Sequence, residues 1–184
     1  MKAFNHSDIL ALEKRYRTNL INKISGYKSA HLIGTQNAAG QTNLAIFSSV
    51  VHIGANPPYL GFIMRPTSVE RHTYENIKSM GYFTLNMVTA DLHEQAHLTA
   101  ARFPRENSEF AATGLTEAYL ADFPAPFVEE SALKIGLSFA EEQLITVNQT
   151  VLIIGKVEQL ILPTDAIKAD GDLDLEALNT VTIG

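Results

Sequence analysis

The residues whose types and spacing most clearly suggest a ligand-binding site lie between Thr42 and Val88. This run contains the Ser48-Ser49 pair, Arg65 at the end of a predicted strand, and an Arg71-His72-Thr73 triplet. Hydroxyls, a guanidinium group and backbone amides at a helix start are the donors that bind phosphate. Small polar residues at a strand edge also leave room for a flat ring. The run therefore predicts a site for a planar ligand that carries phosphate.

Two helix starts are open for the segment after Arg65. Thr67 with Glu70 three residues later fits a capping box, which puts a carboxylate at the helix start and favours a purely structural turn. Thr73 as the N-cap instead leaves Arg71 and His72 just outside the helix, so that a phosphate meets amides, a hydroxyl and a guanidinium together. We prefer the second start. Gly81 is expected to end this helix in the left-handed conformation.

The remaining pattern predicts strands with few helices. We expect a helix capped by Ser7 whose inner face carries Ile9, Leu12, Tyr16 and Leu20, and a hairpin joined by Asn37-Ala-Ala-Gly-Gln. The strands are expected at 30–35, 42–51, 59–64, 82–88, 132–140 and 147–162, with a helix at 91–102 and a loop at 103–126. This order favours a mainly β fold with flanking helices, built mostly of antiparallel sheet as a closed or split barrel. Neither GxGxxG nor a Walker-type loop is present.

Bulk properties exclude several classes. The 184 residues predict one domain, residues 1–184, and 46% hydrophobic content is typical of a globular core. A net charge of −6 argues against nucleic-acid binding. The absence of cysteine means that redox chemistry requires a bound cofactor. No apolar run approaches the roughly twenty residues that span a bilayer, and the N-terminus lacks an apolar signal core, so we expect a cytoplasmic protein without membrane contact.

A competing motif is His93-Glu94-Gln95-Ala96-His97, which matches H-E-x-x-H on a predicted helix. Two imidazoles four residues apart can bind Zn²⁺, with the glutamate activating water. No histidine follows His97, so a third ligand would have to be Glu106, Glu109 or Glu117. We therefore keep a zinc hydrolase as a remote alternative, and expect no metal site. The simpler interpretation of the motif is a polar helix face.

The phosphate-site residues also have ordinary interpretations. Ser48 and Ser49 could be a satisfied strand-end pair, and Arg71 and His72 could simply be solvated before a helix.

Four segments together resemble the flavin reductase-like family, which has an FMN-binding split β-barrel. They are NLAIFSSVVHIGANPP, RHTYENIKSMGYFTLN, EFAATGL and VLIIGKVEQLIL. The resemblance implies a homodimer with one FMN per subunit, whose ring lies against Ser48 and Ser49. It implies a phosphate site near Ser68, Arg71, His72 and Thr73. Arg65 and the backbone near Val50 complete the expected cofactor-binding set.

The function expected from this resemblance is that of an oxidoreductase. Reduced nicotinamide, NADH or NADPH, would visit as a transient reductant and pass hydride to flavin N5. The reduced flavin would then serve oxygen, a partner oxygenase or another small acceptor. The cofactor carries this chemistry, so no side chain is named as catalytic. The alternative is a flavin-binding carrier or electron-transfer module without turnover of its own.

Overall fold

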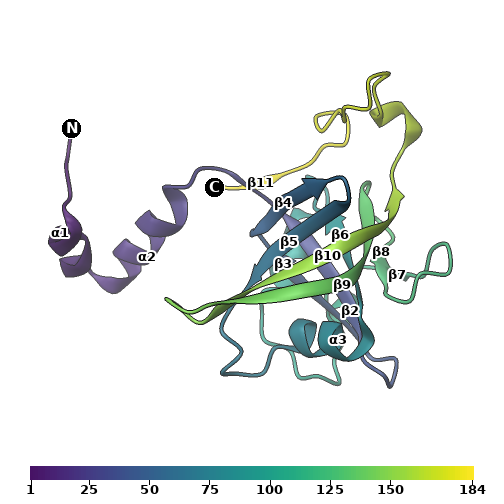
Figure 1. Ribbon diagram of the computed structural model, residues 1–184, viewed down its shortest axis with the longest axis horizontal. Helices are drawn as coiled ribbons and strands as arrows, with labels where there is room; N and C mark the ends of the chain where they lie inside the picture. The colour runs from purple at the N-terminus through teal and green to yellow at the C-terminus, as the bar shows by residue number, and fades with distance from the viewer.

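The computed structural model describes residues 1–184 (Figure 1). Its helices are α1 (His6–Ala11), α2 (Lys14–Lys23), α3 (His72–Met80), α4 (His93–Leu98), α5 (Glu109–Thr113) and the 3₁₀ turn η1 (Thr164–Ala166). Its strands are β1 (Lys28–Ser29), β2 (His31–Gln36), β3 (Thr42–Phe47), β4 (Val50–Ala55), β5 (Pro58–Met64), β6 (Tyr82–Met87), β7 (Glu117–Ala118), β8 (Phe127–Val128), β9 (Lys134–Ile145), β10 (Thr150–Ile161) and β11 (Thr182–Ile183).

The main sheet has seven strands in the order β3-β2-β6-β9-β10-β5-β4, and every pairing in it is antiparallel. Its two edge strands, β3 and β4, are consecutive in sequence and are joined by only Ser48 and Ser49. Three residue steps reach about 10 Å, so the sheet must roll until its edges approach each other. No ladder closes the gap between β3 and β4. The expected mainly antiparallel fold is confirmed, and the barrel is split at Ser48-Ser49.

Apolar side chains pack on both faces of the rolled sheet. One cluster lies among β2, β5, β6, β9 and β10, and its fully buried members include Ile33, Phe62 and Phe83. The other cluster lies where α4 and α5 cover β2 and β3, and includes Leu32 and Phe110. Because neighbouring residues of β2 face opposite sides, this strand is buried on both faces. The burial fixes the position of β2 and of its neighbour β3, and β3 lines the site described below.

Helix α3 packs against β2 through buried Ile77 and Asn76. The Asn76 amide donates a hydrogen bond to Thr35 Oγ1 at 3.1 Å. Gly81 follows the helix with φ +77°, which confirms the expected left-handed ending. The second half of α3 is thereby held against β2.

The N-terminal segment differs from the expected single helix. The helix is interrupted between α1 and α2. There the Glu13 carboxylate caps α2 by accepting hydrogen bonds from the amides of Arg15 and Tyr16 at 2.9 Å each. Neither helix has a buried residue, and the two project away from the sheet (Figure 1). The predicted inner face therefore has nothing to pack against within one chain.

Two further expectations are corrected between β6 and β9. The predicted helix at 91–102 shortens to α4, because the amides of Ala100 and Ala101 bond three residues back and tighten the last turn. The predicted loop at 103–126 contains α5 and β7, and α5 is anchored by buried Phe110. No helix of the protein is both long enough and apolar enough to cross a membrane.

Candidate functional site

A pocket of about 680 Å³ opens beside the split in the barrel. Its walls come from residues 43–49 of β3 and the split, 63–65 at the end of β5, 69–73 at the start of α3, 99–103 after α4, and Glu109 of α5. Sites for nucleotide-sized ligands commonly enclose roughly 300–1,000 Å³. The volume is therefore adequate for a mononucleotide.

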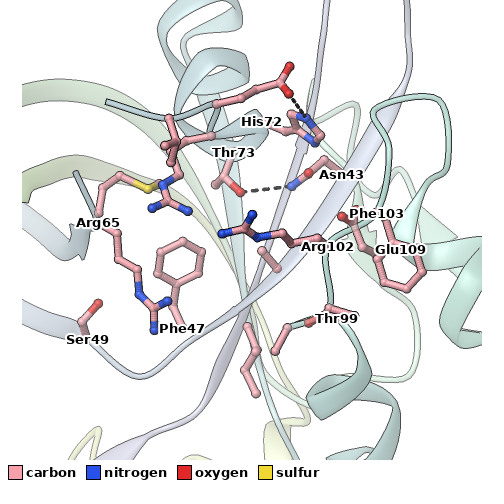
Figure 2. A pocket seen from close by; sticks show the side chains of 18 of the residues that line it. Asn43, Phe47, Ser49, Arg65, His72, Thr73, Thr99, Arg102, Phe103 and Glu109 are labelled. Carbon is pink, nitrogen blue, oxygen red and sulfur yellow. Dashed lines mark hydrogen bonds and ion pairs between the residues drawn. The ribbon is translucent and has the colours of Figure 1, made fainter. Parts of the chain in front are cut away.

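Six of the eight predicted cofactor-binding residues lie in the lining of this pocket: Ser48, Ser49, Arg65, Arg71, His72 and Thr73. Figure 2 shows Ser49 and Arg65 on one side of it, with His72 and Thr73 on the other. Val50 and Ser68 are not among the lining residues. Val50 belongs to β4, where it pairs with Phe62, and Ser68 is exposed in the turn before α3.

Both predicted starts of α3 are wrong. The helix begins at His72 after an N-cap at Arg71, whose side chain makes no capping bond. Thr67 lies in the preceding turn, and Thr73 lies inside the first turn of the helix. The first amides of the helix, at residues 72–74, consequently have neither an intrahelical acceptor nor a side-chain cap. These free amides can bind an anion, as was expected for a helix that starts with Thr73 as its N-cap.

Arg71 is held in place by two bonds at the turn. Its amide donates to Glu75 Oε1 at 3.0 Å, and its Nε donates to the Pro66 carbonyl at 3.2 Å. The two terminal nitrogens of its guanidinium donate to no protein group and remain available to a ligand. The side chain of Arg71 is half-buried.

Carboxylates near the helix start are engaged with a separate arginine. Glu70 Oε1 accepts from Arg105 Nη2 at 2.9 Å, and Glu70 Oε2 lies 3.4 Å from His72 Nε2. The bond from Arg105, followed by that from His72, lowers the pKa of Glu70. Arg105 also pairs with Glu75. By contrast, no ion pair engages Arg65, Arg71 or Arg102, so the pocket keeps unneutralised positive charge.

The split itself presents free backbone donors. The Ser49 hydroxyl donates to the Ile63 carbonyl and accepts from the Ile63 amide, both at 3.1 Å, which ties the split to β5. The side-chain interpretation as a satisfied strand-end group therefore holds for Ser49. The amides of Ser48 and Ser49, however, donate to no protein acceptor, because neither residue joins a ladder. They can serve a ring carbonyl or ring nitrogen.

The lining residues that the sequence did not predict include three with polar or charged side chains that bear on ligand binding: Asn43, Arg102 and Glu109. Asn43 Nδ2 donates to Thr73 Oγ1 at 3.1 Å. The guanidinium of Arg102 extends into the space between Thr73 and Arg65 (Figure 2). A polar residue in a buried strand was the available signal for Asn43. For Arg102 and Glu109 there was none, because folding brings both from distant parts of the chain.

Glu109 is a buried carboxyl group in the wall of the pocket, with 6% of its surface exposed. Its Oε2 accepts from the Leu44 amide at 2.9 Å. Burial raises the pKa of Glu109, an effect that the Leu44 bond, its own amide and the nearby His72 partly oppose. The Glu109 carboxyl group thus anchors the backbone of β3 at Leu44, and it also lines the pocket, where its charge would act on a ligand.

The H-E-x-x-H motif lies on α4, and His93, Glu94 and His97 are exposed there. His93 Nδ1 lies 2.6 Å from the Ala90 carbonyl. No three His, Asp or Glu side chains gather in a group that could hold a metal ion.

Comparisons with solved structures define the class of fold first. A protein of Shewanella frigidimarina assigned as a flavin reductase with a split barrel domain superposes with a TM-score of 0.96 at 49% identity, covering 100% of this chain and 91% of that one. Component B of nitrilotriacetate monooxygenase from Bacillus cereus follows at 0.83 and 18% identity, covering 100% and 96%. The flavoredoxin of Desulfovibrio vulgaris gives 0.73 at 19% identity, covering 86% and 82%. The two distant likenesses show the fold alone.

The sequence comparison then identifies the family. Residues 27–174 match the model of the flavin reductase like domain. An uncharacterized protein of Deinococcus radiodurans is 30% identical over 169 residues, covering 88% of this chain and 73% of that protein. The chain therefore belongs to the flavin reductase-like family.

Proposed function

We propose that this protein is an FMN-binding oxidoreductase, an NAD(P)H-dependent flavin reductase. One observation carries the proposal: the uncapped start of α3 and the split at Ser48-Ser49 line the same pocket. The proposed phosphate site and the proposed ring site thus lie in one pocket, whose volume of about 680 Å³ can hold a single mononucleotide. Membership of the flavin reductase-like family supports flavin as the ligand.

The phosphate is proposed to lie at the start of α3. The amides at 72–74, the Thr73 hydroxyl and the Arg71 guanidinium supply hydrogen bonds and positive charge there. Arg102 adds a second guanidinium. These donors match the terminal phosphate of FMN in both charge and hydrogen-bonding type.

The ring is proposed to lie against Ser48 and Ser49. Their free amides would bond the ring's polar edge and favour its anionic reduced form, because fixed donors stabilise charge that develops beside them. Val50 and Ser68 stay proposed contacts that depend on the bound geometry. When bound, FMN supplies a hydride acceptor at N5 for reduced nicotinamide. The chain's own residues bind and orient the ligands, and no protein acid or base is required.

The reduced cofactor is proposed to pass its electrons to oxygen, to a partner oxygenase or to another small acceptor. The likeness to a monooxygenase component is consistent with the second of these. The likeness to flavoredoxins keeps the alternative of a carrier without turnover.

Anaerobic titration with NADH and NADPH separates the two functions. We expect purified protein saturated with FMN to lose its yellow absorbance when either nucleotide is added. Persistent colour at saturating NADH and NADPH would favour the carrier. Protein that binds no FMN at all would contradict both.

A homodimer is part of the same proposal. Helix α2 has ten residues and no buried side chain, and helices of that length are marginal in water by themselves. Tyr16, Ile21 and Ile24 leave apolar surface exposed along it. A second copy of the chain would cover this surface.

Light scattering tests the dimer. Ile21→Lys should shift the protein from about twice the chain mass toward the single-chain mass, because an ammonium group would enter an apolar interface. Arg15→Ala, which changes an exposed side chain on the other side of the same helix, should leave the mass unchanged. A wild-type monomer would contradict the proposal.

A further inference from the structure

A second and smaller recess adjoins the pocket at the split. It encloses about 270 Å³, and we call it the lysine recess because Lys23 and Lys28 line it. Ser48 and Arg65 line both the recess and the main pocket, so the two spaces are continuous. The end of β11 forms the remaining wall.

The lysine recess is lined by three cationic side chains. Lys23, Lys28 and Arg65 line it together, and none of the three forms an ion pair. The chain as a whole has a net charge of −6, and lysines elsewhere do pair with carboxylates, as Lys78 does with Glu142 at 3.2 Å. No aspartate or glutamate side chain lines the recess. Cations collected in a concave site raise the local concentration of anions.

Backbone structure fixes where these cations lie. Lys28 Nζ donates to the Asn22 carbonyl near the end of α2 at 2.6 Å, which links β1 to that helix. Lys28 also pairs across the short sheet with Ile183 of β11, another residue of the recess. Lys23 is thus presented by α2 and Lys28 by β1, whereas Arg65 directly follows β5.

The lysine recess lies at the ring end of the main pocket. Figure 2 shows Ser49 and Arg65 on the side away from His72 and Thr73, where the FMN phosphate is proposed to bind. Lys23 and Lys28, which do not line the main pocket, are therefore left over after FMN has been placed. A volume of about 270 Å³ is below the range typical of a whole nucleotide, but it accommodates phosphate groups that enter from the pocket.

We propose that the lysine recess binds the phosphates of a second nucleotide, whose own ring reaches the flavin through the boundary formed by Ser48 and Arg65. The proposed ligand is a dinucleotide whose adenosine half carries phosphate groups. NADH and NADPH belong to this class. This inference rests on the proposed flavin reductase function and assigns Lys23 and Lys28 to reductant binding.

Calorimetry with ADP tests the recess without turnover. Full-length protein saturated with FMN is titrated with ADP and, separately, with 2′-AMP. ADP carries the diphosphate common to NADH and NADPH, whereas 2′-AMP carries the phosphate found only in NADPH. Binding of either probe that depends on the lysines supports the site and tells which phosphate occupies it.

The test variant is Lys23→Gln combined with Lys28→Gln. We expect it to weaken binding of the tighter probe at least about tenfold, because two charge-assisted contacts are lost. The Michaelis constant for NADH or NADPH should rise by a similar factor, with kcat and the FMN dissociation constant within about twofold of wild type. Lys28→Arg should retain most of the probe affinity, which separates charge from the structural link to Asn22.

Lys14→Gln on the same helix is the matched control and should change none of these values. Unchanged probe affinity in the double variant, or no binding of either probe to wild type at millimolar concentration, would overturn the proposal. Failure of the flavin function would be seen separately, as protein that stays colourless after incubation with FMN.

Discussion

Asn43 of β3 donates a hydrogen bond through Nδ2 to Oγ1 of Thr73 in the first turn of α3, at 3.1 Å, and both residues are buried. Because the Thr73 oxygen is the acceptor in this bond, its own hydrogen is directed elsewhere and can be donated to an anion. The bond also fixes α3 against the edge strand beside the split. A strand residue thereby sets the position of a hydroxyl group that is proposed to donate a hydrogen bond to the FMN phosphate.

Replacing Thr73 by valine should weaken FMN binding and lower stability. The hydroxyl donor is lost, and the buried Asn43 amide loses its acceptor, which costs about 1–3 kcal/mol of unfolding free energy. Thr73→Ser keeps the hydroxyl and should retain most of the affinity. Fluorescence titration with FMN and chemical denaturation measure the two effects. Equal FMN affinity in the valine variant and wild type would remove the hydroxyl from the site.

Replacing Arg71 by alanine should weaken FMN binding by about 1.5–3 kcal/mol, with the fold retained, because a charge-assisted contact to phosphate is lost. Arg102→Ala should have an effect of the same sign, since its guanidinium reaches the same pocket. Riboflavin, which lacks the phosphate, should bind both variants as it binds wild type. A loss of riboflavin affinity equal to the loss of FMN affinity would place these arginines at the ring instead.

Glu109→Gln should strengthen FMN binding by about 1 kcal/mol at neutral pH, because a buried negative charge is removed from the wall of a phosphate site. The glutamine oxygen can still accept the Leu44 amide. Glu109→Leu, which cannot accept it, is the control for structural damage and should be less stable than the glutamine variant. Weaker FMN binding by the glutamine variant would show that the carboxylate helps to position a ligand.

The same substitution should alter how stability depends on pH. Because the pKa of Glu109 is raised by burial, the folded protein holds this proton more tightly than the unfolded chain. Stability from this group is therefore present below the unfolded pKa and is lost as pH rises through the folded pKa. The glutamine variant should gain stability relative to wild type as pH increases from about 4.5 upward.

His31 should destabilise the fold in acid. It is 4% exposed, its Nδ1 has no hydrogen-bond partner, and burial lowers its pKa from 6.5 to about 4. Its stability contribution is present above pH 6.5 and is lost as pH falls toward 4, by about 3 kcal/mol in all. His31→Leu should flatten this part of the pH profile measured by denaturation.

Local patterns predicted much of the fold. The turn residues Asn37 and Gly40 located the hairpin of β2 and β3, β-branched and aromatic residues located β3, and Gly81 marked the end of α3, where it has a positive φ. The Ser48-Ser49 interruption was predicted, but not that it separates the two edges of one sheet, since that depends on pairings with distant β10 and β6. The start of α3 was missed because Arg71 is fixed by Glu75 rather than by a side-chain cap.

The candidate site was predictable only where it is local. Residues 71–73 adjoin in sequence and share one phosphate-binding pattern, so they could be recognised together. Glu109 reaches the pocket because α5 packs on β3, and Arg102 because α4 ends early; neither fact is encoded in adjacent residues. The single inner face predicted for the first helix is divided between α1 and α2, and neither helix has a buried residue within the chain.

The location of the FMN phosphate tests the central claim most directly. A crystal structure of the protein with FMN should place the phosphate within hydrogen-bond distance of the amides at 72–74 and of Arg71, with the ring beside Ser48 and Ser49. A flavin bound elsewhere, or a phosphate turned away from the start of α3, would contradict the account.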